Sequence, residues 1–320
     1  MSTPDLDKDD ATGSRRAPMD EGEMQRSTAS YGGNVATPSR VRRSVLEPIR
    51  RLRLVLRQAE RVARWSTAPS KWARPGLASA DDGVTYPYRV YERAVRIARM
   101  DPDADLRFEA GKRTNLALAA PYFDGLIVAP HAPLSFWRAL GRTSRRRGFV
   151  EGMELHGGCV VPAIGGGLCL LSNALFDMAL TLGWVVLERH GHSLEAIPPA
   201  SGTLWGIDAT VFWPHVDLRI APREGDARLG VRVAHGVLRL TVHARSPAAY
   251  DCKLHTLDDR TYLRRAGVFR ENRVVRDVVH RATGECIEST VIAHNRKRLL
   301  TRDERGGCSS CKVHDCARRG

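Results

Sequence analysis

The chain has 320 residues, of which 42% are hydrophobic, so it can bury the core of one large domain or of two modest ones. It carries 50 Lys and Arg against 36 Asp and Glu, a net charge of +14 that favours anionic partners such as nucleic acid, lipid headgroups or acidic cell-wall polymers. Seven cysteines in a chain of this length exclude a small secreted disulfide scaffold and indicate thiols or metal ligands in a reducing compartment.

The N-terminal part is polar. Residues 1–43 lack the apolar stretch of an export signal, and we expect them to form a disordered tail. No later window has the uninterrupted apolar length of a membrane span. We therefore expect a cytoplasmic location, with peripheral binding to the membrane as a further option.

Residues 44–76 are predicted to form a basic amphipathic helix and a linker. Ser44 and Glu47 resemble a capping box at the start of the helix. Apolar residues recur at alternating spacings of four and three, which is typical of one face of a helix. Arginines occupy much of the remaining surface. These apolar residues are Val45, Ile49, Leu52, Leu56, Ala59 and Ala63. We prefer a helix packed on the main domain with a solvated arginine face over one that binds a membrane surface or nucleic acid.

Residues 77–300 are predicted to form an α+β domain with a mixed or antiparallel sheet and a few helices. Its first part shows a short helix at residues 114–120 and a strand at residues 125–130, each ended by a proline. A helix is predicted from Leu168 to a stop at Gly183, followed by a buried strand at residues 184–190.

The later part of this domain reads mainly as strands. Residues 231–242 alternate apolar and polar side chains around the turn His235-Gly236, which predicts a hairpin. From there to about Ile292 the sequence remains strand-like, with frequent charges.

The stretch IGGGLCLLS at residues 164–172 places three glycines directly before a cysteine. At a helix start, unpaired N–H groups and the helix dipole stabilise a thiolate, so Cys169 is a candidate nucleophile. Glycines would let a substrate carbonyl approach the backbone, as an oxyanion hole requires. The candidates for this role are Gly165, Gly166, Gly167 and Ser172. Two other readings are a glycine loop that cradles phosphate and a buried cysteine beside a tight connection.

The candidate bases lie in ERHGHS, where His190 and His192 follow the predicted strand. A helix that runs away from Cys169 and a strand that runs back would return these histidines to the cysteine. A third group would orient the histidine, as in a catalytic triad. The residues that could do so are Ser193, Asp208 and Glu188.

Residues 115–217 resemble the VanW family in the order and spacing of their motifs. The matching pieces are NLALAA (115–120), SFW (135–137), Gly141, Gly148-Phe149, GGGLC (165–169), LSN (171–173), ERHGHS (188–193), DATV (208–211) and Asp217-Leu218. The position after the cysteine is usually glutamine in the family and is Leu170 here.

The resemblance implies a cysteine acyltransferase, because exported family members are associated with L,D-transpeptidase activity on peptidoglycan and with glycopeptide resistance. It implies Cys169 as the nucleophile and His192 as the base, oriented by Ser193 or Asp208. No cofactor is implied for this site. In a chain expected to be cytoplasmic, the substrate would be a peptide or a cell-wall precursor.

The C-terminal residues 301–320 form a cysteine-rich tail. Cys308, Cys311 and Cys316 have the spacing C-x2-C-x4-C, and His314 lies between the last two. This predicts a zinc site, or an iron–sulfur cluster, with a free thiol tail as the alternative. The candidates for a fourth ligand are His314, Cys286, His294 and Cys252.

Two further functions stay open beside the acyltransferase. A non-catalytic binding protein could retain the family scaffold and hold a metal in its tail. Binding of nucleic acid or another anionic surface would suit the net charge of +14 and the arginine-rich helix, although aromatic residues, 6% of the chain, do not gather on the basic segments.

Overall fold

The computed structural model describes residues 40–67, 71–76, 85–98, 106–156, 159–192, 194–195, 204–264 and 267–299. The chain divides into two units, Met1–Leu52 and Arg53–Gly320. In the first unit, the described residues belong to the beginning of helix α1 (Arg40–Thr67). Most of the predicted N-terminal tail and the whole cysteine-rich tail lie outside the described residues.

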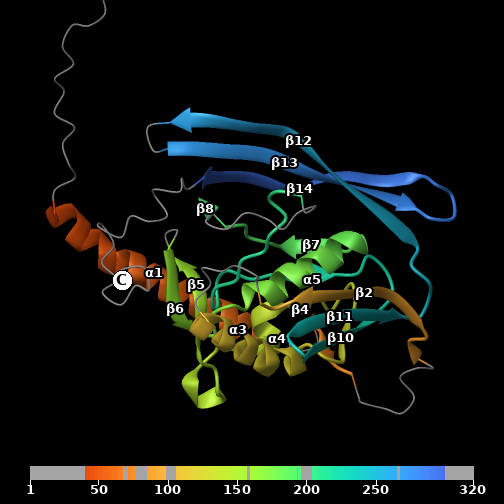
Figure 1. Ribbon diagram of the computed structural model, residues 1–320, viewed down its shortest axis with the longest axis horizontal. Helices are drawn as coiled ribbons and strands as arrows, with labels where there is room; N and C mark the ends of the chain where they lie inside the picture. Colours follow the sequence, from red (N-terminus) through yellow and green to blue (C-terminus); the bar gives the residue numbers. More distant parts are fainter. Residues whose placement is uncertain are drawn as a thin grey trace, which may run out of the picture. The chain divides into compact units, whose positions relative to one another are not determined.

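The second unit is a mixed α+β structure with few helices and largely antiparallel sheets, which confirms the expected fold class (Figure 1). After the last part of α1, its helices are α3 (Leu106–Ala119), α4 (Phe136–Leu140) and α5 (Cys169–Thr181). Short 3-10 helices cover Ala120–Tyr122 and Arg145–Arg147. In the part of the chain that the structure describes, none of the helices is both long and apolar enough to cross a bilayer.

Two larger sheets make up most of this unit. The first has the order β1-β3-β10-β11-β2, with β1 (Arg74–Pro75), β2 (Tyr88–Arg96), β3 (Leu126–Val128), β10 (Ala227–Ala234) and β11 (Val237–Ala244). The second has the order β12-β13-β14-β8, with β12 (Tyr250–Arg264), β13 (Gly267–His280), β14 (Cys286–Leu299) and β8 (Leu194–Glu195). The short strand β8 runs parallel to the end of β14, which brings the segment after His192 beside the C-terminal strand.

Two smaller sheets complete the unit. One has the order β4-β9-β7, with β4 (Leu134–Ser135), β9 (Arg219–Ala221) and β7 (Val185–Glu188). The other pairs β5 (Glu151–His156) with β6 (Cys159–Ile164).

Helix α5 lies in the core between the two larger sheets, since it contacts β11 of the first and β12 of the second (Figure 1). Most of its residues are apolar and buried, which is typical of a helix within a protein core. Leu171, Leu175, Phe176 and Met178 are all fully buried. This packing fixes the helix whose first residue is Cys169.

Two sequence predictions are confirmed in detail here. Helix α5 ends just before Gly183, whose φ of +69° suits a glycine. The hairpin β10–β11 turns at His235 and Gly236, with φ of +51° and +72°. Positive φ at both central residues is the geometry of a type I′ turn, which matches the twist of the flanking strands.

Three local predictions were wrong. The strand after α5 is not buried, because β7 is an edge strand whose Val185 and Leu187 are 36% and 47% exposed. Helix α3 extends over residues 106–119, well before the predicted start at Thr114. Helix α1 begins at Arg40, so Ser44 lies inside the helix and not at its N-terminal cap.

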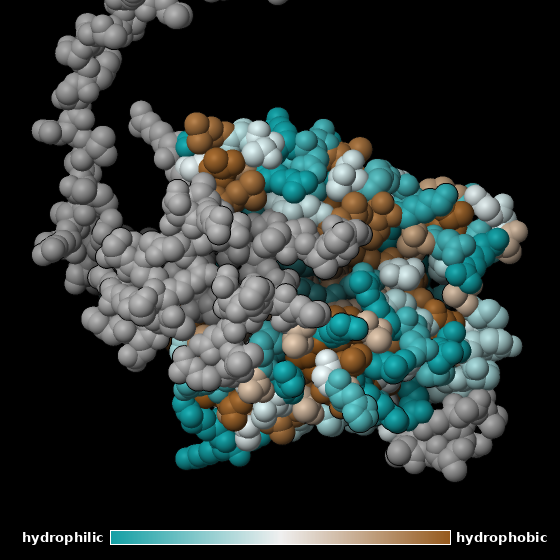
Figure 2. All heavy atoms as spheres, viewed as in Figure 1, coloured by the Kyte–Doolittle hydropathy of each residue, from teal (hydrophilic) through white to brown (hydrophobic). Residues whose placement is uncertain are grey.

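The strands β12–β14 carry many charges that pair across the sheet. Arg270 donates two hydrogen bonds of 2.8 Å to Asp259, and Arg273 Nε donates to Asp258 at 2.7 Å. Figure 2 shows hydrophilic side chains over much of one face of the molecule, between scattered hydrophobic ones.

Asn115 on α3 ties the glycine loop to the chain before β5. Its amide nitrogen donates to the carbonyl of Gly166 at 2.9 Å and to that of Val150 at 3.0 Å, and its oxygen accepts from the Val150 N–H at 2.9 Å. The side chain is fully buried, so water cannot replace these contacts.

Replacing Asn115 with alanine should lower the free energy of unfolding by about 2–4 kcal/mol, because buried backbone groups lose their partners. Urea unfolding followed by circular dichroism measures the change. The matched control is Thr114→Ala, whose exposed hydroxyl donates only to Ala110 within the helix and whose loss should cost less than about 1 kcal/mol. Equal effects from the two variants would contradict this role of Asn115.

Candidate active site

The glycine loop owes its composition to close packing. Gly165 and Gly167 have φ of +83° and +92°, a conformation that favours glycine. A Cβ atom on Gly166 would lie 2.3 Å from the carbonyl group of Gly152 on β5, and one on Gly167 would lie 2.5 Å from the Lys112 side chain. The glycines are therefore explained by contacts within the protein, independently of any substrate.

Part of the loop already uses its N–H groups. Gly165 donates to the Val150 carbonyl at 3.0 Å, and Gly166 donates to the Ala163 carbonyl at 2.9 Å. For the described residues, no backbone carbonyl accepts from the N–H of residues 167, 168 or 169. The donors left for an oxyanion are thus those of Gly167, Leu168 and Cys169 itself.

The motifs LSN and DATV bind each other through their side chains and backbone. Ser172 is fully buried, and its hydroxyl donates to the Ala209 carbonyl at 2.6 Å. The Ala209 N–H donates to Asn173 Oδ1 at 2.7 Å. Ser172 therefore holds the segment opposite the helix and does not face a substrate. The next residue, Thr210, lies with its hydroxyl oxygen 3.9 Å from Cys169 Sγ.

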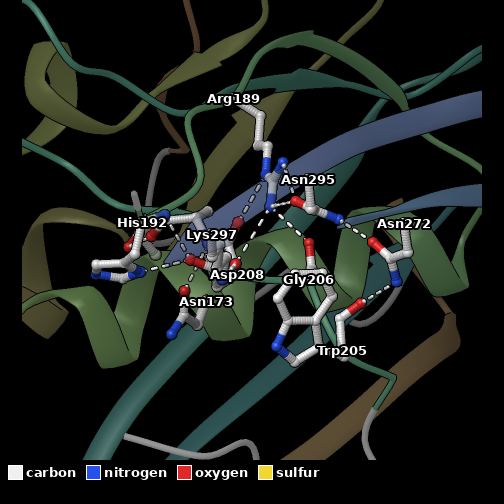
Figure 3. Close-up of polar contacts among 11 residues, drawn as sticks. Asn173, Arg189, His192, Trp205, Gly206, Asp208, Asn272, Asn295 and Lys297 are labelled. Atoms are coloured by element: carbon white, nitrogen blue, oxygen red, sulfur yellow. Dashed lines mark hydrogen bonds and ion pairs between the residues drawn. The ribbon is translucent and has the colours of Figure 1, made fainter. Parts of the chain in front are cut away.

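His192 is oriented by Asp208. One oxygen of Asp208 accepts from the backbone N–H of His192 at 2.8 Å and lies 2.5 Å from its Nδ1 (Figure 3). With Nδ1 engaged, Nε2 is the ring nitrogen left for the hydrogen bond with the Cys169 thiol. The structure therefore brings together Cys169, His192 and Asp208 in the order of a nucleophile, a base and its orienting carboxylate.

Asp208 is itself held by two cations. Lys297 Nζ on β14 lies 2.7 Å from Oδ1, and Arg189 contacts the same oxygen at 3.3 Å (Figure 3). Both cationic side chains are only 8% exposed. Burial would raise the pKa of Asp208, but the hydrogen bonds from His192 and the charge of Lys297 hold that pKa well below its usual value.

Arg189 is in turn fixed by a network of buried amides. It donates to the Gly206 carbonyl at 2.6 Å and contacts Asn295 Oδ1 at 3.4 Å (Figure 3). Asn295 donates to Asn272 at 2.9 Å, so β13 and β14 together support the carboxylate.

The contact between Cys169 and His192 shifts both groups toward their charged forms. Burial raises the pKa of the Cys169 thiol, but the hydrogen bond and charge of His192 outweigh it, and the pKa is lowered. Burial lowers the pKa of His192, whereas Asp208 and Cys169 raise it to about 9. A thiolate and an imidazolium are therefore favoured together over a range of pH that ends near 9.

Residues 111–242 match the family model described as VanW like protein. This segment, less than half of the chain, is therefore similar to the VanW family. The Vancomycin B-type resistance protein VanW of Enterococcus faecalis is 30% identical over 137 residues, which are 42% of this chain and 50% of that protein. The uncharacterized protein YoaR of Bacillus subtilis is 31% identical over 107 residues, 33% of each protein. This chain thus matches half or less of the length of these relatives, and no solved structure resembles it detectably.

The VanW segment contains the three central residues but not all of their support. Lys297 and Asn295 lie on β14, well beyond residue 242. Sequence reasoning missed them because they belong to a charged strand with no local signal. It also passed over Thr210 and Arg189, although both lie inside quoted VanW motifs and could have been found there.

The remaining predicted site residues lie away from Cys169 and His192 or outside the described residues. Glu188 does not orient His192; it accepts from Arg61 at 2.9 Å and lies 3.1 Å from His190. Ser193 lies outside the described residues, as do the predicted metal ligands Cys308, Cys311, Cys316 and His314. Among the described residues, no three His, Cys, Asp or Glu side chains are arranged to hold a metal ion.

A cavity of about 340 Å³ lies away from Cys169, between Trp184, Arg245 and Tyr250. Two of its charged groups pair with each other, since Arg245 Nε lies 2.6 Å from Asp226. It shares no lining residue with the network around Asp208.

Asp208→Asn should lower the pKa of His192 from its value of about 9, because the hydrogen bond and charge of the carboxylate are lost while burial, which lowers that pKa, remains. An NMR titration of ¹³C-labelled histidine in the full chain measures this. The matched control is Asp277→Asn, which removes the carboxylate 3.3 Å from Nδ1 of His255 on the surface and should leave His192 unchanged. A wild-type His192 that titrates near 6.5 would contradict the geometry.

Proposed function

We propose that this VanW-like protein is a cysteine acyltransferase of the L,D-transpeptidase type, which acts on peptidoglycan-type peptides or their precursors. The observation that supports it is the chain of contacts from the Cys169 thiol through His192 to Asp208. Packing alone does not explain why a half-buried carboxylate held by two cations should point at this histidine.

In the first step, the Cys169 thiolate attacks the carbonyl carbon of a substrate peptide bond and forms a C–S bond. The carbonyl oxygen becomes an oxyanion near the N–H groups of residues 167–169 at the start of α5. The C–N bond then breaks, and the His192 imidazolium gives its proton to the leaving amine. The product of this step is a thioester on Cys169.

In the second step, an amine of another peptide, or water, attacks the thioester. Neutral His192 takes the proton of the attacking group, and the C–S bond breaks to restore the thiolate and the imidazolium. Asp208 stays ionised throughout and keeps Nδ1 protonated. No redox partner or metal takes part in these steps.

The substrate class rests on the relatives and on charge. The similarity to a protein named for vancomycin resistance connects this scaffold with the cell wall. A net charge of +14 suits peptides that carry free carboxylates. His192 is 25% exposed, so the site is open to a ligand from solvent.

Incubation with a synthetic peptidoglycan stem tetrapeptide that ends in D-Ala should release D-Ala and add the mass of the tripeptide less one water to the chain. Intact-mass spectrometry detects this adduct, and peptide mapping should place it on Cys169. Cys169→Ala should abolish it, because the C–S bond cannot form.

The matched control is Cys252→Ala. Cys252 is also half-buried, but burial raises the pKa of its thiol, and its loss should leave the adduct unchanged. An adduct that persists in Cys169→Ala would overturn the proposed nucleophile. Absence of both adduct and D-Ala release from the wild type would favour the non-catalytic alternative.

A further inference from the structure

Among the described residues, the last part of α1 contacts the strands and loops of the second unit through Arg61 and Trp65. Arg61 Nη1 donates to both carboxylate oxygens of Glu188, at 2.9 and 3.0 Å. Trp65 is 6% exposed and packs on Trp213, with 5.5 Å between ring centroids. The residues that make these contacts lie close together on the helix, near its C-terminal end.

The neighbouring face of this part of α1 is apolar and uncovered. Val55 and Leu56 are 57% and 59% exposed, and Val62 is 39% exposed. Ala59 and Ala63 are exposed as well. At about 100° per residue, these five side chains fall within an arc of about 120°, which is the apolar stripe of an amphipathic helix. The preference for a helix whose apolar face packs on the domain is therefore wrong for residues 55–63.

A basic face lies next to the apolar one. Arg53, Arg57 and Arg64 are exposed and share one arc of the helix, separated from the apolar stripe by Glu60, which pairs with Arg64. The sequence continues this pattern toward the N-terminus, with arginines at positions 40, 42, 43, 50 and 51. An exposed apolar stripe beside a row of arginines, in a helix that is otherwise rich in polar and charged residues, is the composition of helices that lie in a membrane interface.

We propose that α1 binds the surface of a membrane containing anionic phospholipid. The apolar stripe at residues 55–63 enters the boundary between headgroups and acyl chains, and the arginines contact phosphate groups. A lipid surface would contact the apolar stripe and the arginines at the same time. Nucleic acid would engage the arginines but leave the stripe in water, and a second copy of the helix would bring arginines of like charge together.

Binding of α1 to a membrane would also place the candidate active site, and this step rests on the proposed function. Arg61 binds Glu188, and the same segment continues to Arg189 and His192. Helix α1 bound to a bilayer would therefore hold the site close to the lipid surface, where it could reach a peptide substrate carried on a lipid.

The test is co-sedimentation of the full chain with vesicles of phosphatidylcholine containing about 30% phosphatidylglycerol, compared with pure phosphatidylcholine. The wild type should bind the anionic vesicles, and Leu56→Asp should weaken binding by about tenfold or more. Arg53→Gln with Arg57→Gln should weaken binding and reduce its dependence on salt. These side chains are exposed, so the variants should keep the wild-type circular dichroism spectrum.

The matched controls are Leu263→Asp and Arg264→Gln on β12, where Leu263 is 79% exposed. Both should bind like the wild type. Equal binding by Leu56→Asp and the wild type would overturn the proposal. So would a vesicle-free dimer that Leu56→Asp dissociates, or binding of duplex DNA without binding of vesicles. Vesicle binding does not depend on acyl transfer, so failure of the proposed catalytic function would leave this result unaffected.

Discussion

The candidate site depends on the half-buried carboxylate of Asp208. An ionised carboxylate away from water is costly unless cations and hydrogen-bond donors surround it. Here Lys297 and Arg189 supply the positive charge, and the backbone N–H and Nδ1 of His192 supply two hydrogen bonds. Because one carboxylate oxygen binds both the backbone and the ring of His192, the imidazole has one orientation. That orientation presents Nε2 to Cys169 and accounts for the opposite shifts in the pKa values of the two groups.

The VanW motifs lie far apart in the sequence, and hydrogen bonds between them join them in the structure. DATV binds LSN through Ala209, and it binds ERHGHS through Asp208 and through the Thr210 N–H, which donates to the His190 carbonyl at 2.8 Å. NLALAA reaches the glycine loop through Asn115. SFW binds the later Asp217, whose carboxylate accepts from the Ser135 hydroxyl at 2.5 Å. The motifs therefore mark backbone segments that meet around α5.

Local pattern predicted much of the fold and the centre of the site. Apolar periodicity and a glycine stop located α5, and the turn residues located the β10–β11 hairpin. Cys169, His192 and Asp208 could be predicted from their residue types and from the motifs that contain them. Lys297 could not be predicted, since it approaches Asp208 only through the pairing of β14 with the distant β8. The exposure of β7 and of the apolar face of α1 also depends on which neighbours cover them, and side-chain periodicity carries no information about those neighbours.

In the proposed function, His192 activates Cys169 in the folded protein. The most direct test of this activation is the pH dependence of Cys169 alkylation by iodoacetamide, read by mass spectrometry at the peptide level in the wild type and in His192→Ala. We expect the wild-type thiol to react well below its ordinary pKa of about 8.5 and the rate to change again near pH 9, as His192 loses its proton. His192→Ala should abolish the low-pH reactivity. A Cys169 that reacts only above its ordinary pKa in the folded wild type, or equally in both proteins, would contradict this activation.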